Sequence, residues 1–236
     1  MEKYIMKLSE RTLEVLKNFA SINQSILFTE GNELNTVSVQ KNVLGSATVA
    51  ETFKSSNGED FALYDLNEFL STVSLFDDPE IEFGEQFATI KDANSVTHYW
   101  FADKEIIVYP TSKIEMPSAE VKFRLTAATL DKLQRATGTL AVPDLVIRRG
   151  KNDPSKVVAE VLDKRNDTSN TFSVEVGDYI GGESDTEFKF YFLTERMKML
   201  PGDYDVEISA KKISKLTSTD GKLTYWIALE QDSTYE

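Results

Sequence analysis

Two segments of the chain carry leucines at the spacing of a helix with one buried face. They read LSERTLEVL at 8–16 and LTAATLDKL at 125–133. In each, a hydroxyl residue, Ser9 or Thr126, stands where an N-cap side chain accepts a hydrogen bond from a free amide of the first turn. The pattern predicts two helices with these residues on the same face: Leu13, Leu16 and Ala20 in the first, and Leu130, Leu133 and Thr137 in the second.

Most of the remaining chain consists of short runs rich in β-branched and aromatic residues, bounded by Gly, Asn, Asp or Ser. This composition is typical of strands. The expected strands of the first half are 26–28, 36–39, 47–53, 61–64, 80–83 and 88–91. Those of the second half are 145–148, 157–162, 171–176, 188–193, 204–210 and 223–229.

Two more pairs of segments repeat in the same order as the helices. Residues 97–101 (THYWF) resemble 224–227 (TYWI), and 66–68 (LNE) resemble 193–195 (LTE), each opening a short helical stretch. Three ordered pairs indicate an internal repeat. We therefore expect an α+β chain with two similar domains, 1–110 and 121–236. They are joined by a connector at 111–120, near which Pro110 and Pro117 bracket a stretch without periodicity.

The charge of the chain restricts how it can bind polyanions. Its 236 residues include 26 Lys and Arg against 39 Asp and Glu, a net charge of −13. A protein this acidic does not attract nucleic acid or anionic lipid over its whole surface, so such contact requires a segregated basic patch. We see neither a secretory signal nor a membrane span, and cysteine is absent, so a reducing cytoplasm is the expected setting.

Candidate catalytic chemistry is sparse. No phosphate-binding loop, dinucleotide glycine pattern or HExxH motif is present, and the one histidine, His98, lies within an expected strand. The acidic residues Asp77, Asp78, Glu80 and Glu82 allow a divalent-cation site or a hydrolase as one alternative, although Pro79 fits a solvated turn better. We expect no catalytic residue, no metal and no cofactor.

Basic residues concentrate on the repeated helices. Residues 122–137 carry Lys122, Arg124, Lys132 and Arg135 against one acid, Asp131. The first helix presents Arg11 and Lys17, preceded by Lys7, and Arg196 and Lys198 lie on a fourth helical stretch. Each helix alone is consistent with an ordinary solvated face. Their recurrence in an acidic chain favours a segregated polyanion-binding surface.

Four segments resemble the DNA polymerase sliding clamp of T-even-type bacteriophages. They are MKLSERTLEVLKNFASIN (6–23), ALYDLNEFLSTVSLFDDPEIEF (62–83), MKMLPGDY (197–204) and ALEQDSTYE (228–236). The resemblance covers both ends and both halves, is looser at 40–60 and 150–185, and leaves residues 1–5 as an extension without a known role. A structural or assembly protein is the alternative, because repeated β-rich domains also build viral shells.

The resemblance implies a non-catalytic processivity factor. Two clamp domains per chain would form a head-to-tail homotrimeric ring, with helices around a hole that encircles duplex DNA and sheets outside. An ATP-driven clamp loader, DNA polymerase and transcription factors would be its partners, in the cytoplasm of the infected bacterium. The DNA-facing residues would be Arg11, Lys17, Lys132, Arg135, Arg196 and Lys198. The second helix departs from a basic lining, because residues 65–76 contain Asp65 and Glu68 and no cation.

Two further sites follow from the resemblance. A partner peptide would bind beneath the connector, near Val39, Ile114, Met116, Ile227 and Leu229. Strand edges of two subunits would pair at Glu105, Ile106, Ile107, Val108 and Tyr109 of the first domain and at Thr171, Phe172, Ser173, Val174, Glu175 and Val176 of the second.

Overall fold

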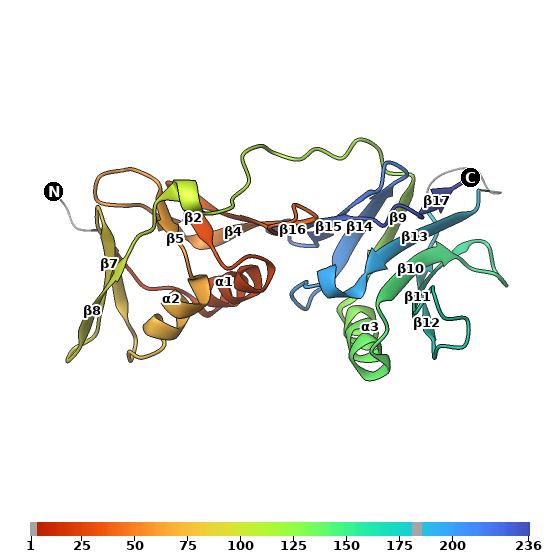
Figure 1. Cartoon of the computed structure of the whole chain (residues 1–236), viewed down its shortest axis with the longest axis horizontal. Coiled ribbons are helices and arrows are strands. Elements are labelled where there is room, and N and C mark those ends of the chain that lie inside the picture. The colour runs from red at the N-terminus through yellow and green to blue at the C-terminus, as the bar shows by residue number, and fades with distance from the viewer. Residues whose placement is uncertain (1–3, 181–185) are drawn as a thin grey trace. The chain divides into compact units, whose positions relative to one another are not determined.

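The computed structural model describes residues 4–180 and 186–236, and the chain divides into two compact units, Met1–Ser112 and Lys113–Glu236 (Figure 1). The elements of the first unit are β1 (Ile5–Met6), α1 (Glu10–Ile22), β2 (Ile26–Phe28), β3 (Gly31–Val37), β4 (Val43–Phe53), β5 (Phe61–Leu63), α2 (Leu66–Val73), β6 (Glu80–Phe83), β7 (Phe87–Lys91), β8 (Val96–Trp100) and the 3-10 helix η1 (Lys104–Ile106).

The second unit repeats this order. Its elements are β9 (Val121–Leu125), α3 (Ala127–Leu140), β10 (Asp144–Arg149), β11 (Lys156–Leu162), β12 (Phe172–Asp178), β13 (Phe188–Leu193), the 3-10 helix η2 (Thr194–Arg196), β14 (Tyr204–Ser209), β15 (Ile213–Ser218), β16 (Leu223–Ala228) and β17 (Thr234–Tyr235).

All strand pairs within each unit are antiparallel. In the first unit the order β1-β6-β7-β8 forms one sheet, β2 pairs with β5 and β3 pairs with β4. In the second, β9, β14, β15 and β16 lie side by side, and a second sheet has the order β12-β11-β10-β13-β17. β1-β6-β7-β8 thus corresponds strand by strand to β9-β14-β15-β16.

The three repeated segment pairs lie on equivalent elements. Ser9 and Thr126 cap α1 and α3, Leu66 begins α2 while Leu193 directly precedes η2, and the paired tryptophans lie in β8 and β16. The expectation of an α+β fold with two similar domains is therefore confirmed.

The two main helices begin in the same way. The Ser9 hydroxyl accepts a hydrogen bond from the Thr12 amide, and the Thr126 hydroxyl accepts one from the Thr129 amide, both at 3.3 Å. α1 then packs on β4 at Gly45, where an added Cβ would lie 2.8 Å from the Phe19 ring. A glycine is therefore required for this close approach of helix and strand.

A cluster of aromatic rings, of which all but the half-buried Phe101 are buried, holds the elements of the first unit together. Phe61 stacks with Phe28, Phe83 and Phe101 at centroid distances of 4.9, 4.6 and 4.8 Å, and Phe28 also contacts Phe53 at 4.7 Å. These rings come from four different strands and the segment after β8. Such contacts stabilise beyond simple burial by about 0.5–1.5 kcal/mol per pair.

Three expected elements differ in the structure. No strand forms over Glu105–Tyr109; the Asp103 side chain accepts a hydrogen bond from the Glu105 amide and starts η1 instead, so β8 is the edge strand. The fourth helical stretch is only the 3-10 helix η2, which ends before Lys198. The strand expected to reach Val39 ends at Val37.

Within the described ranges, no helix is long and apolar enough to span a bilayer.

The capping hydrogen bond of α3 predicts a measurable stability loss. We expect Thr126→Ala to lower the free energy of unfolding of the second unit by about 1 kcal/mol, because an amide of the first turn loses its acceptor. Thr139→Ala, an exposed threonine on the same helix, is the matched control. Urea unfolding followed by circular dichroism compares the two; equal stability would contradict the role of the cap.

Candidate nucleic-acid interface

The exposed face of α1 carries two of the expected DNA-facing cations. α1 buries Thr12, Val15, Leu16, Phe19 and Ala20 against the unit and leaves Arg11 and Lys17 exposed. The Arg11 guanidinium is 3.0 Å from the Glu14 carboxylate on the next turn. This exposed pair partly neutralises the arginine.

α3 presents an equivalent face in the second unit. It buries Leu130 and Leu133 and exposes Lys132 and Arg135. The Arg135 guanidinium is 2.8 Å from the Asp131 carboxylate, one turn earlier. Each helix therefore combines one arginine that has an acidic neighbour with one lysine, and neither Lys17 nor Lys132 forms an ion pair with any residue in 4–180 or 186–236.

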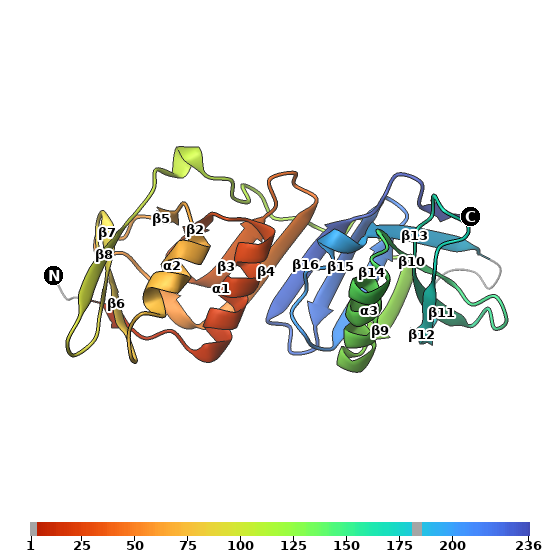
Figure 2. The same ribbon diagram turned by 60° about the horizontal axis from the view of Figure 1, so that its bottom comes forward.

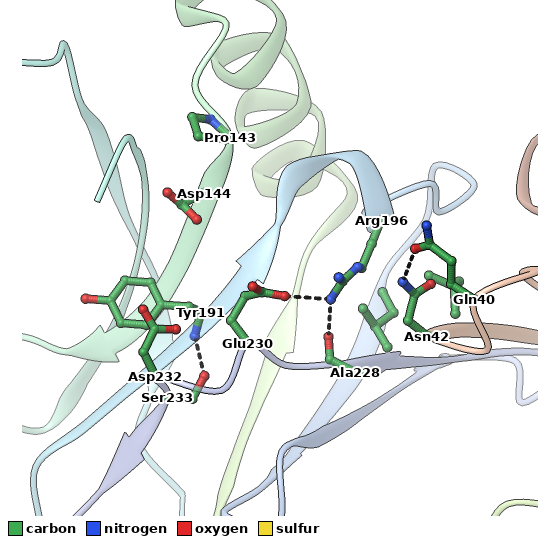
Figure 3. Close-up of polar contacts among 12 residues, drawn as sticks. Gln40, Asn42, Pro143, Asp144, Tyr191, Arg196, Ala228, Glu230, Asp232 and Ser233 are labelled. Carbon is green, nitrogen blue, oxygen red and sulfur yellow. Dashed lines mark hydrogen bonds and ion pairs between the residues drawn. The ribbon is translucent and has the colours of Figure 1, made fainter. Parts of the chain in front are cut away.

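Arg196 is not presented to solvent as a free cation. Its Nη1 is 2.8 Å from Glu230 Oε1 and donates a longer bond, 3.4 Å, to the Ala228 carbonyl (Figure 3). Its side chain is 16% exposed, so most of the guanidinium is withdrawn from solvent. Lys198 lies beyond η2 and is exposed. Arg196 therefore stabilises the packing of the C-terminal segment onto the second unit.

α2 is acidic on its exposed face, as its sequence predicts. The Asp65 side chain caps α2 by accepting a hydrogen bond from the Glu68 amide at 2.9 Å. The Glu68 carboxylate accepts a hydrogen bond from the Tyr99 hydroxyl at 3.0 Å. Burial, followed by this bond and the neighbouring carboxylate charges, raises the pKa of Tyr99 well above its ordinary value. α2 is thus fastened to β8 and offers no cation.

A carboxylate anchors the start of α1. Glu51 on β4 accepts hydrogen bonds from the Ser9 amide and the Thr12 hydroxyl. Partial burial alone would raise the pKa of Glu51, but the Thr12 and Ser9 hydrogen bonds outweigh it and lower the pKa below its ordinary value. An anion at the N-terminus of a helix also interacts favourably with the helix dipole.

The five expected partner-pocket residues differ in exposure. Val39 is 70% exposed and Ile114 is 37% exposed, and Met116 is half-buried. Ile227 and Leu229 are 0% and 4% exposed and belong to the core of the second unit. The last two side chains are therefore unavailable on the surface of that unit.

β8 and β12 each end a sheet and have one strand neighbour. β8 pairs with β7, and its Val96 and Trp100 side chains are 63% and 64% exposed. β12, which contains Phe172 to Val176 of the expected interface, pairs with β11 along its length. Just after β12, Ile180 forms an isolated bridge with Lys122 of β9.

The acidic run and the histidine show no arrangement for catalysis. Asp78 pairs with Lys7, and the Glu80 carboxylate is 3.3 Å from Lys91. No metal-binding group of His, Asp or Glu side chains exists among residues 4–180 and 186–236. His98 is exposed on β8, with its Nδ1 3.3 Å from the Thr89 hydroxyl.

Comparison with known proteins decides the family. The model of a DNA polymerase processivity factor matches residues 7–109, and that of the gp45 sliding clamp, C terminal, matches 122–231. Sliding clamps of Escherichia phage RB69 and Enterobacteria phage T4 are 34% and 32% identical, each over 98% of this chain and the whole relative. The chain belongs to the sliding clamp family.

Solved structures agree on the fold of the clamp. The proliferating cellular nuclear antigen of Entamoeba histolytica matches 98% of this chain and all of its own with a TM-score of 0.71 at 12% identity. A putative DNA polymerase III β subunit from Eubacterium rectale matches 98% of this chain and 67% of its own with a TM-score of 0.67 at 14% identity.

Family membership establishes the function of the clamp as a processivity factor that encircles DNA, without enzymatic activity. DNA and DNA polymerase are its partners, and it acts in the infected host cell. The alternatives of a shell protein and of a hydrolase are therefore wrong.

The ion pairs that partly neutralise Arg11 and Arg135 were not among the features predicted from the sequence. The signal was present, because Glu14 follows Arg11 by three residues and Asp131 precedes Arg135 by four, the spacings at which helical side chains meet. The anchoring of α1 by Glu51 had no such signal, because the two partners are distant in the sequence.

The low pKa of Glu51 predicts a pH-dependent stability difference. A carboxyl whose pKa is lowered by folding stabilises the protein above its unfolded value, and this contribution is lost as pH falls through the folded pKa. We expect Glu51→Gln to be less stable than the parent at neutral pH, with the difference shrinking below about pH 4.5. Thermal unfolding across pH measures it. Glu33→Gln, an exposed glutamate on β3, is the control, and a pH-independent difference would contradict the assignment.

Proposed function

We propose that three copies of the clamp close head-to-tail into a ring around duplex DNA, with β8 of one copy beside β12 of the next. The observation that supports this most directly is the pair of open strand edges. An exposed edge presents unpaired amides and carbonyls that another strand can satisfy. When one edge of a copy meets the other edge of the next copy, the contact is heterologous. Such contacts form a ring when the rotation from each copy to the next adds up to a full turn.

Side chains at the two edges suit a partly apolar contact. Val96 and Trp100 leave large apolar areas exposed on β8, and Phe87 packs edge-on against the Trp100 indole at 5.1 Å. On β12, Ser173 and Glu175 are exposed, while Val176 is buried. The proposed interface therefore uses β8 in place of Glu105–Tyr109 as its first edge, and it keeps β12 as its second edge.

In this ring α1 and α3 would face the DNA. Lys17 and Lys132 would then supply phosphate contacts, while Arg11 and Arg135 remain engaged with Glu14 and Asp131. A ring is retained by topology and needs little affinity, and sparse contacts to phosphates carry no sequence information. The net charge of −13 would repel DNA from the remaining surface.

Retention on DNA raises the effective concentration of polymerase at the primer end. We propose that an ATP-driven clamp loader opens the ring, and that transcription factors use the same clamp in the cytoplasm of the infected bacterium. Partner peptides would contact the connector at Ile114 and Met116. Val39 is a further exposed candidate.

The ring predicts a concentration-dependent mass. Light scattering over a dilution series should show a species of three times 26.6 kDa that dissociates on dilution. Val96→Lys should weaken association and reduce processive synthesis on primed circular DNA, because an ammonium group left without a partner in the edge contact costs more than the about 1–3 kcal/mol of a neutral polar group. Leu75→Lys is the control at an exposed leucine outside both strand edges. A monomer at all concentrations would contradict the ring.

The lysine contacts predict a change in salt dependence. Each phosphate contact contributes about one unit to the slope of log affinity against log salt. We expect Lys17→Gln with Lys132→Gln to flatten this slope for clamp on closed circular DNA more than Arg11→Gln with Arg135→Gln does. Equal slopes for the two double variants would contradict the assignment of the phosphate contacts to the lysines.

A further inference from the structure

A hollow of about 190 Å³ lies within the first unit between α1, α2 and the turn that leads into β6. α1 and α2 lie beside each other in this unit (Figure 2). Seven apolar residues line the hollow, and four polar residues complete its wall. The apolar residues are Leu8, Leu13, Leu70, Val73, Phe76, Pro79 and Ile81, and the polar ones are Lys7, Lys17, Ser74 and Asp78.

The floor and the walls of the hollow differ in burial. Leu70, Val73 and Ile81 are buried and form the floor, whereas Leu13 and Phe76 are only half-buried and border the opening. An apolar cavity of about 150 Å³ holds a molecule of benzene size. This hollow therefore has room for one ring or one branched aliphatic group.

The charges around the opening favour an anion beside that apolar group. Asp78 is already paired with Lys7. Lys17 is exposed and has no ion-pair partner among the residues that the structure describes. Once the Lys7–Asp78 pair is counted as neutral, one positive charge remains beside an apolar opening.

The polar groups present are poorly suited to a nucleobase. The Ser74 hydroxyl donates its hydrogen bond to the Ser71 carbonyl at 2.7 Å, and the Asp78 carboxylate is engaged by Lys7. The edge of a base would enter the hollow with its donors and acceptors unpaired, which is costly in an apolar site. A hydrocarbon side chain has no such cost.

We propose that this hollow binds a leucine- or phenylalanine-sized side chain of a partner protein, flanked by a carboxylate that pairs with Lys17. The apolar floor buries the side chain, and Lys17 selects an acidic segment. Because Lys17 is also the proposed phosphate contact of α1, a bound acidic segment withdraws one cation from DNA. The binding itself does not depend on ring closure.

Methyl NMR spectra of the full chain, titrated with the blocked tripeptide Asp-Phe-Asp, test the site. Saturable shifts are expected at the methyl groups of Leu13, Leu70, Val73 and Ile81. Replacing the central Phe of the peptide by Ala should abolish them. Lys17→Gln should weaken binding by up to about fivefold, the range of one exposed ion pair, whereas Lys132→Gln should not.

A filling variant gives a second readout. Ser74→Phe should block the hollow and remove the shifts, whereas Ser71→Phe, on the exposed face of α2, should preserve them. Absence of saturable shifts, equal shifts with the alanine peptide, or indifference to Lys17→Gln would overturn the proposal. If thymidine monophosphate caused saturable shifts of the same methyl groups and the tripeptide caused none, the proposal would be overturned in favour of a nucleotide site. Light scattering of the same samples tests ring formation separately.

Discussion

The unpaired backbone at the strand edges is the constraint on which the organisation of this protein depends. A sheet that ends in a regular strand leaves a row of amides and carbonyls that must be hydrated, shielded or paired with another chain. β8 and β12 are such strands, each with a paired neighbour on one side. Because the fold is duplicated, each chain carries two different open edges, the arrangement that permits head-to-tail closure rather than a symmetric dimer.

The helices are fixed to their sheets by contacts that leave their outer faces available. Hydroxyl caps begin α1 and α3 in the same manner, Glu51 ties α1 to β4, and Gly45 allows the helix to approach the strand closely. None of these contacts uses Lys17 or Lys132. The side chains that stabilise the fold are therefore different from those proposed to contact DNA, so the proposed contacts can be weak without weakening the core.

The positive charge available for DNA is smaller than the number of expected cations indicates. Three of the six expected DNA-facing residues are arginines, and each lies within 3.0 Å of a carboxylate oxygen. Arg11 and Arg135 are each paired with a carboxylate on the exposed face of their own helix, whereas Arg196 is largely buried and held by two acceptors. A clamp that must slide gains from this arrangement, because few cations remain to bind phosphates tightly.

The sequence by itself determined what depends on neighbouring residues. Helical periodicity, the caps at Ser9 and Thr126, the alternation of the strands and the ordered repeat were all predictable from local pattern. Only the tertiary structure decided that β8 rather than Glu105–Tyr109 is the edge, that Ile227 and Leu229 are buried, and that α1 and α2 leave a hollow beside Lys17. The physical reason is that local patterns arise from the geometry of consecutive residues, whereas edges, burial and cavities depend on segments distant in the sequence.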